Sequence, residues 1–337
     1  MRLTLADIAR MAGVSSTTAS RVLNGRGEVR PEVRERVERV IQETGYRPLA
    51  SARALVSRRS EVVGLVLPLG AGEVLEDPYF IELIKSFGAA TSARRLAGAL
   101  FVFDDEHDQD ALLDRVVGPR RVDGIIMSAY HVRDEVIERL AEFDVPLVTM
   151  GDNTVPERVG SVTVDNYAGG YAVGEHLAGL GRSRIGTVTG PMSSISGADR
   201  LRGFRAGLSA HGVTLEADLI REGAYTRESG STRSGELMDL GADAIFVASD
   251  TMATGSLEAA RARGLSVPGD VAIAGFDGLP SSEHARPTLT TVRQPIREVV
   301  DAALELLADQ VDDPASPVRA ETFPVELIVR ESTAGRP

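Results

Sequence analysis

The chain has 337 residues, no cysteine and a net charge of −12, with 43% hydrophobic and 26% charged residues. Without cysteine, disulfides and thiolate metal sites are excluded, and no apolar run approaches the roughly 20 residues that a membrane span needs. The N-terminus lacks a signal-peptide core, so we expect a cytoplasmic protein with two or three domains.

The charge is unevenly distributed along the chain. Residues 1–60 hold 12 Arg against 6 Asp or Glu, a net charge of +6, whereas residues 61–337 carry −18. A small basic segment joined to a large acidic body is typical of a DNA-binding head attached to another domain. Lys85 is the single lysine, so phosphate contacts are expected from arginine.

Two short helical patterns meet at a tight turn between Thr4 and Asn24. Thr4 and Asp7 form a capping-box pattern at a helix start, Gly13 suits the left-handed conformation that ends a helix, and a second helix is expected from near Ser15. The apolar residues at helical spacing are Leu5, Ile8, Ala9, Ala12, Ala19, Val22 and Leu23. The pattern predicts a helix-turn-helix whose second helix lies in a DNA major groove. An ordinary helical hairpin is the alternative.

A third helix is expected to begin at Pro31 and to end at Gly45, with Val33, Val37, Val40 and Ile41 as its buried stripe. Three helices in about 45 residues make a marginal core, so support from a dimer or from DNA is expected. The basic stretch 46–60 is interpreted as a linker. Its residues 50–56 could form a brief helix only if a groove or a second copy holds it, and a flexible tether is the alternative.

From residue 62 onward, apolar runs alternate with helical stretches. The expected strands are 62–68, 99–103, 124–128, 146–150, 161–164, 185–189, 244–249 and 271–277, and the expected helices are 79–94, 166–180, 200–211, 251–263 and 296–308. Continuous apolar strands separated by helices indicate parallel sheets covered on both faces. Eight or more strands over some 270 residues favour two sheets over one.

Ligands of open parallel sheets bind beyond the carboxyl ends of the strands. The polar residues at or after those ends are Ser128, Asp152, Ser249, Asp250 and Asp277. Asp165 and Asp250 are interpreted first as helix caps. Three aromatics are candidate faces for a sugar or base ring, with burial in the core as the alternative for each: Tyr79, Phe80 and Tyr225.

No catalytic motif is present. The five histidines lack metal-ligand spacing, and the chain has no HExxH, GxSxG, Walker loop or full GxGxxG. With nothing to activate a nucleophile, binding is favoured over catalysis, and no catalytic residue, metal or cofactor is expected.

Taken whole, the chain resembles a bacterial repressor of the lactose/galactose repressor (LacI/GalR) family. The matching stretches are TLADIARMAGVSSTTASRVLNG, GYRPLASARAL, VDNYAGGYAVGEHLAGLGRSRIGTVTG, RLRGF, SDTMATGSLEAARARGLSVPGDVAIAGFD and TVRQPIREV. The resemblance implies an all-α helix-turn-helix head (1–46), a hinge (47–60), an α/β periplasmic-binding-protein-like core (61–330) and a tail (331–337). It further implies two doubly wound parallel-sheet subdomains, at about 61–160 with 291–320 and about 161–290 with 321–330.

By this resemblance, Ser16 and Thr17 open the recognition helix and touch base edges beside Arg21. Ser20 and Asn24 would hold the DNA backbone, while Leu55 would wedge into the minor groove at the operator centre. The full set implied for DNA binding is Thr4, Ser15, Ser16, Thr17, Ser20, Arg21, Asn24 and Leu55.

The resemblance also implies an effector site in the core, where Arg200 matches the arginine that grips the ligand. The full set is Tyr79, Phe80, Ser128, Asp152, Arg200, Tyr225, Ser249 and Asp277. A sugar is the expected effector, and a nucleoside or a phosphorylated metabolite stays open.

Three residues depart from the family pattern. Leu49 stands where asparagine is usual in the hinge, Arg30 stands where a capping serine is common, and Ser249 replaces an asparagine at the cleft. The tail after Val329 has no leucine heptad, so a dimer is expected. We therefore expect an effector-controlled homodimeric repressor of carbohydrate-utilisation genes on a pseudo-palindromic double-stranded DNA operator. The alternative is a free-standing solute-binding protein or a sugar-processing enzyme.

Overall fold

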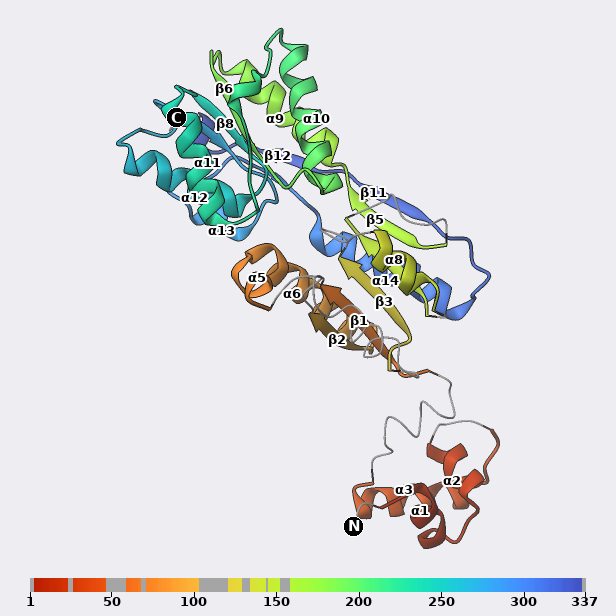
Figure 1. Cartoon of the computed structure of the whole chain (residues 1–337). Coiled ribbons are helices and arrows are strands. Elements are labelled where there is room, and N and C mark those ends of the chain that lie inside the picture. The colour runs from red at the N-terminus through yellow and green to blue at the C-terminus, as the bar shows by residue number, and fades with distance from the viewer. Residues whose placement is uncertain are drawn as a thin grey trace. The chain divides into compact units, whose positions relative to one another are not determined.

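A computed structural model of the chain describes residues 3–23, 27–46, 59–67, 71–102, 121–128, 134–143, 145–151 and 158–334. The chain divides into two compact units, Met1–Ser60 and Glu61–Pro337 (Figure 1). The division falls at residue 60, the expected end of the hinge. The hinge residues Leu49 and Leu55 lie outside the described residues.

In the described part of the first unit, three helices pack together: α1 (Leu5–Met11), α2 (Ser16–Leu23) and α3 (Pro31–Thr44). The predicted capping box of Thr4 and Asp7 is present. Gly13 and Gly45 have φ of +66° and +59°, the left-handed conformation predicted where each helix ends. Arg30, just before α3, makes no side-chain cap hydrogen bond.

The core of this unit is built from small side chains. Ala9 and Ala19 are buried and pack against Ala12, Val22 and Val37, which lets the first two helices approach closely. Arg36 of α3 donates from Nε to the backbone oxygen of Ala12 at 2.7 Å and fastens α3 to the end of α1. The predicted apolar stripes are confirmed, although Leu5, Leu23, Val33, Val40 and Ile41 are half-buried and not fully buried.

The second unit contains two parallel sheets, as predicted. Among the described residues, one sheet has the order β11-β5-β4-β3-β1-β2 and the other β7-β6-β8-β9. The strands of the first sheet are β1 (Val62–Leu67), β2 (Ala97–Val102), β3 (Gly124–Ser128), β4 (Leu147–Met150), β5 (Gly160–Val164) and β11 (Ala320–Phe323). Those of the second are β6 (Ile185–Thr189), β7 (Ile220–Glu222), β8 (Ala244–Val247) and β9 (Ala272–Ala274), and β10 (Thr291–Arg293) pairs antiparallel with β12 (Glu326–Ile328).

Helices cover both faces of each sheet, which makes both subdomains doubly wound. On the first sheet, Leu65 and Leu67 face α6 and α14, whereas Val66 faces the opposite side with α8. The helices of the first subdomain are α5 (Ala71–Glu76), α6 (Pro78–Ala93), α8 (Asp134–Ala141) and α14 (Ile296–Asp312). Those of the second are α9 (Asn166–Gly179), α10 (Ile195–Ala210), α11 (Arg227–Asp239), α12 (Asp250–Ala262), α13 (Pro280–His284) and α15 (Glu331–Ala334).

The chain crosses between the subdomains a few residues later than expected. β5 ends at Val164 and β11 spans Ala320–Phe323, and both belong to the first sheet. β10 pairs with β12, and its Val292 is buried in the core of the second subdomain. The expected tail also contributes to this core, because Ser332 of α15 is fully buried and donates to the backbone oxygen of Ile273 at 2.6 Å.

Helices α9 and α10 pack through glycines, so the backbones are almost in contact. A Cβ at Gly203 would lie 2.0 Å from the backbone oxygen of Tyr167, whereas a Cβ at Gly179 meets nothing within 4 Å. We expect Gly203→Ala to destabilise the second unit by about 1–3 kcal/mol, because the helices must move apart. Gly179→Ala is the matched control and is expected to leave the thermal unfolding temperature unchanged or raised. Equal melting temperatures for the two variants would contradict this packing argument.

Candidate ligand cleft and nucleic-acid interface

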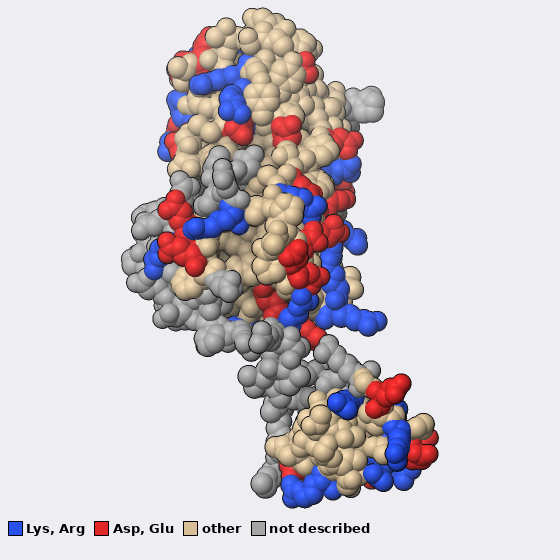
Figure 2. Space-filling model, turned by 90° about the vertical axis from the view of Figure 1, so that its right-hand side faces the viewer, with Lys and Arg blue, Asp and Glu red and all other residues tan. Residues whose placement is uncertain are grey.

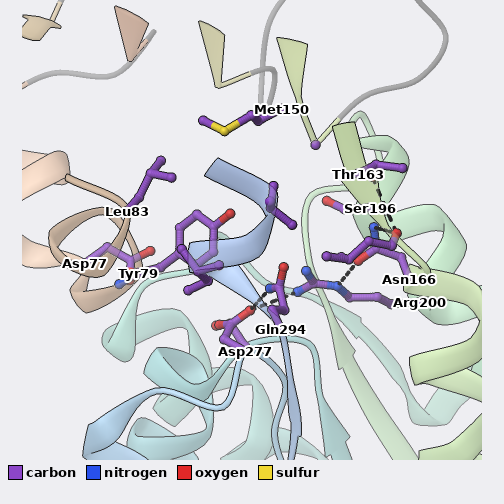
Figure 3. A pocket seen from close by; sticks show the side chains of 15 residues that line it. Asp77, Tyr79, Leu83, Met150, Thr163, Asn166, Ser196, Arg200, Asp277 and Gln294 are labelled. Atoms are coloured by element: carbon purple, nitrogen blue, oxygen red, sulfur yellow. Dashed lines mark hydrogen bonds and ion pairs between the residues drawn. The ribbon is translucent and has the colours of Figure 1, made fainter. Parts of the chain in front are cut away.

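A cavity lies between the two subdomains of the second unit. Figure 3 shows Asp77, Tyr79 and Leu83 on one wall and Asn166 and Arg200 on the opposite wall. The remaining lining residues are Met150, Gly151, Thr163, Val164, Ser196, Ser249, Asp277, Gln294, Ile296 and Val299. Apolar side chains combined with a few polar groups are the usual lining of a small-molecule site.

Arg200 of α10 is held in place from several sides. Its Nε donates to Oδ1 of Asn166 at 2.8 Å, and its Nη1 donates to the backbone oxygen of Ala248 at 2.6 Å. The guanidinium carbon lies 3.7 Å from the ring centre of Phe276, and Nη1 lies 3.5 Å from Oδ1 of Asp277. Arg200 is only 4% exposed, so the cleft contains a buried cation in a fixed orientation.

Asp277 follows β9 and is buried beside Arg200. Its Oδ1 accepts a hydrogen bond from Nε2 of Gln294 at 2.7 Å, and its Oδ2 accepts one from the backbone N–H of Asp250 at 3.3 Å. Burial raises the pKa of Asp277 to about 7, although the charge of Arg200 acts to lower it. Desolvation therefore outweighs the ion pair, and this carboxyl titrates near neutrality.

The interpretation of Asp250 as a helix cap is wrong. Ser249 caps α12, since its Oγ accepts from the backbone N–H of Met252 at 3.2 Å. The Asp250 carboxylate instead accepts from the backbone N–H of Leu279 at 2.8 Å and from Oγ1 of Thr291 at 2.6 Å. Burial, followed by the charge of Asp277, raises the pKa of Asp250 well above its usual value. The predicted cap at Asp165 is confirmed, since its Oδ1 accepts a hydrogen bond from the backbone N–H of Ala168 at 2.8 Å.

Asp77 is a cleft residue that sequence reasoning missed. It caps α6 by accepting from the backbone N–H of Tyr79 at 3.0 Å, and burial raises its pKa. The Asp-Pro pair at the start of a predicted helix was the available signal, because aspartate is a preferred cap and proline suits the next position. Burial also raises the pKa of the Tyr79 hydroxyl, with the nearby charge of Asp277 as the next cause.

The structure places half of the predicted effector set at the cavity: Tyr79, Arg200, Ser249 and Asp277. Phe80 is instead 2% exposed in the core of the first subdomain, with its ring edge-on to Tyr79 at 5.4 Å. Tyr225 is buried in the core of the second subdomain, and Ser128 is buried at the end of β3. Asp152 lies outside the described residues.

The first unit presents the start of α2 to solvent. Ser15 caps this helix, with its Oγ accepting from the backbone N–H of Thr18 at 3.1 Å, while Ser16, Thr17 and Arg21 are exposed. Ser20 is half-buried and Thr4 is exposed in its capping box; Asn24 lies outside the described residues. Figure 2 shows several blue Lys or Arg side chains on the surface of this unit, with red Asp or Glu side chains among them. An exposed polar helix start on a basic surface fits a duplex groove.

A helix-turn-helix head joined to a two-subdomain core with a ligand cleft defines a ligand-responsive DNA-binding protein. Residues 4–48 match the family model described as bacterial regulatory proteins, lacI family, and residues 174–333 match that of a periplasmic binding protein-like domain. The chain belongs to the lacI family of bacterial regulatory proteins, which confirms the resemblance stated from the sequence.

The similarity to known members extends over the whole chain. The HTH-type transcriptional regulator CelR of Thermobifida fusca is 36% identical over 98% of each chain. A solved CelR–cellobiose complex has a TM-score of 0.77 at 34% identity, covering 98% of this chain and 100% of its own. A lac repressor dimer bound to operator and the anti-inducer ONPF has a TM-score of 0.85 at 26% identity, with 99% of each chain covered.

These comparisons confirm the predicted fold class. In the described part of the chain, no helix is both long and apolar enough to span a bilayer.

Proposed function

We propose that this protein is a sequence-specific transcriptional regulator, a repressor of carbohydrate-utilisation genes that a sugar-like effector controls from the cleft. The observation that carries the proposal is the exposed start of α2 on a basic head, in a chain whose second unit contains a polar ligand cavity. The full-length similarity to CelR and to the lac repressor supports it. The protein acts where bacterial DNA lies, in the cytoplasm, and is not an enzyme.

DNA recognition is assigned to the exposed end of α2. Ser16 and Thr17 contact base edges, and Arg21 contacts a base or a phosphate beside them. Ser15 sets the start of the helix through its cap to Thr18. Thr4, Ser20 and Asn24 complete the head's contacts with the DNA backbone, and Leu55 enters the minor groove.

A homodimer fits the apolar groove between α6 and β2, which Ile84, Phe87, Leu96 and Leu100 help to line. Leu100 is 47% exposed although it lies in the sheet, and large apolar side chains exposed in this way mark protein contact sites. The solved relative on operator is a dimer. Two heads related by a two-fold axis read the two halves of a pseudo-palindromic operator.

The effector is assigned to the cavity because its polar groups suit a polyhydroxylated ligand. Asp77 and Asp277 accept hydrogen bonds, Arg200 and Gln294 donate them, and the Tyr79 ring offers an apolar face for a sugar. The cellobiose in the CelR complex supports a carbohydrate.

The test is a fluorescence anisotropy titration with duplexes from the region upstream of the protein's own gene. We expect one palindromic site to bind at least about 10³-fold more tightly than random duplex at physiological salt. Equal affinity for all duplexes would reject the proposal.

We expect Arg21→Ala to weaken operator binding by roughly 10- to 100-fold, because an exposed arginine contact with a base or phosphate is lost. The matched control is Arg205→Ala, an exposed arginine on α10 of the second unit, which should leave operator affinity unchanged. Both variants should keep the wild-type melting temperature. Unchanged binding by Arg21→Ala would remove this residue from the interface.

A further inference from the structure

One hydrogen bond at the cavity joins the two subdomains directly. Oγ1 of Thr251 donates to Oδ1 of Asp77 at 3.0 Å, across 174 residues of sequence. Asp77 caps α6 of the first subdomain, and Thr251 lies in the first turn of α12 of the second. Neither residue belongs to a segment through which the chain crosses between the subdomains, so the contact depends on how close the two halves lie.

The same contact orients the Asp77 carboxylate. Oδ1 accepts two hydrogen bonds, from Thr251 and from the backbone N–H of Tyr79. Among the described residues, Oδ2 accepts none, although Asp77 lines the cavity. One oxygen therefore anchors the carboxylate, and the other is available to a ligand.

We propose that Asp77 is an effector acceptor and that Thr251 is its positioning residue, which sets the carboxylate from the opposite side of the cleft. The site for the ligand is then complete only in the closed arrangement of the subdomains. A ligand that uses Oδ2 stabilises this arrangement, because it binds the closed state better than the open one. This inference rests on the proposed function for the identity of the site.

The arrangement selects the chemical class of the effector. A carboxylate oxygen accepts hydrogen bonds, so Asp77 favours a hydroxyl or amine donor on the ligand. Asp77 and Asp277 lie on the same cavity, and the negative charge of Asp77 is one of the causes that raise the pKa of Asp277. The nearby cation, Arg200, is already paired with Asp277. A phosphorylated ligand would add negative charge beside the Asp77 carboxylate, so we expect the cleft to favour an unphosphorylated sugar.

Hydrogen–deuterium exchange of the full-length, ligand-free protein tests the positioning role. We expect Thr251→Val to speed exchange about five-fold both at the start of α12 and at the start of α6, because one hydrogen bond of ordinary strength is lost. Thr251→Ser keeps the hydroxyl and should restore the wild-type rates. Thr254→Val is the matched control, since Oγ1 of Thr254 donates only within α12, to the backbone oxygen of Asp250 at 3.0 Å.

Faster exchange of Thr251→Val confined to α12 would overturn the inference, because the bond would then have no effect on the opposite subdomain.

Thermal shifts with glucose and glucose 6-phosphate, and with ribose and ribose 5-phosphate, test whether the cleft favours an unphosphorylated sugar. A rise in melting temperature from the unphosphorylated member alone supports it, and a larger rise from the phosphate overturns it. Operator binding by the wild type, measured separately, distinguishes failure of this inference from failure of the proposed function.

Discussion

Replacing Arg200 with alanine is expected to abolish the rise in melting temperature that an effector sugar produces. The variant loses the hydrogen bonds that Arg200 donates to Asn166 and to Ala248, and it loses the ion pair with Asp277. Because the oxygens of Asn166 and Ala248 would remain buried without their donor, we also expect the second unit to lose about 1–3 kcal/mol of stability. The measurement is a thermal shift with each sugar that stabilises the wild type, since a native-state ligand raises the melting temperature.

A second variant separates loss of the ligand contact from loss of the fold. Arg200→Met with Asp277→Asn removes both charges, so much of the stability should return, while the response to sugar stays absent. Operator binding by the head, measured by anisotropy, should persist in this double variant. A normal sugar response in either variant would exclude Arg200 as an effector ligand.

The stability of the second unit is expected to fall as the pH rises from about 4 to about 7. The pKa of Asp277 is raised to about 7 in the folded protein, whereas an unfolded aspartate titrates near 3.9. The native state therefore binds more protons than the unfolded state in this window, and its stability decreases with pH. The contribution is complete below about pH 4 and is lost above about pH 7.

The control for this prediction is Asp277→Asn, whose stability should vary less across the same window. Asparagine has the same shape as the aspartate that adopts the positive φ of this position, +116°, so the exchange changes the charge and not the backbone. Burial lowers the pKa of His176, so the contribution of this residue to stability increases with pH. This contribution is the same in the wild type and in Asp277→Asn, and it cancels in the difference between their stability curves. Chemical denaturation at several pH values gives the two curves. Parallel curves would contradict the assigned titration of Asp277.

The head could be predicted closely because its signals are local. A capping box, two helix-ending glycines and a proline at the start of a helix each act within a few residues, and all are present in the structure. The eight apolar strands were equally visible, since most of them are buried on both faces and therefore read as continuous hydrophobic runs.

Short and polar elements of the second unit escaped prediction. β7 and β12 have three residues each, and both begin or end with glutamate, so neither shows an apolar run. Helix α11 contains two glycines and four serines or threonines between charged residues, and it lacks a broad apolar stripe. Its close contact with α12 depends on Gly230, where a Cβ would lie 2.1 Å from the backbone oxygen of Met252. Tertiary packing, more than intrinsic helix propensity, determines this helix.

Only part of the cleft could be inferred from residue types at strand ends. Tyr79, Arg200, Ser249 and Asp277 line the cavity as expected. Phe80 does not, because the next residue on a helix points about 100° away from its neighbour and reaches the core. Tyr225 packs into its own subdomain, and the Asp77–Thr251 contact depends on two segments that sequence alone cannot bring together.

The central claim is that a ligand in the core controls DNA binding by the head. It is tested most directly by anisotropy titration of the operator with and without a saturating sugar identified by thermal shift. Because coupling between two sites is reciprocal, the sugar should change operator affinity by the same factor by which operator changes sugar affinity, about 5- to 150-fold. Operator affinity that does not change at saturating sugar would contradict the account.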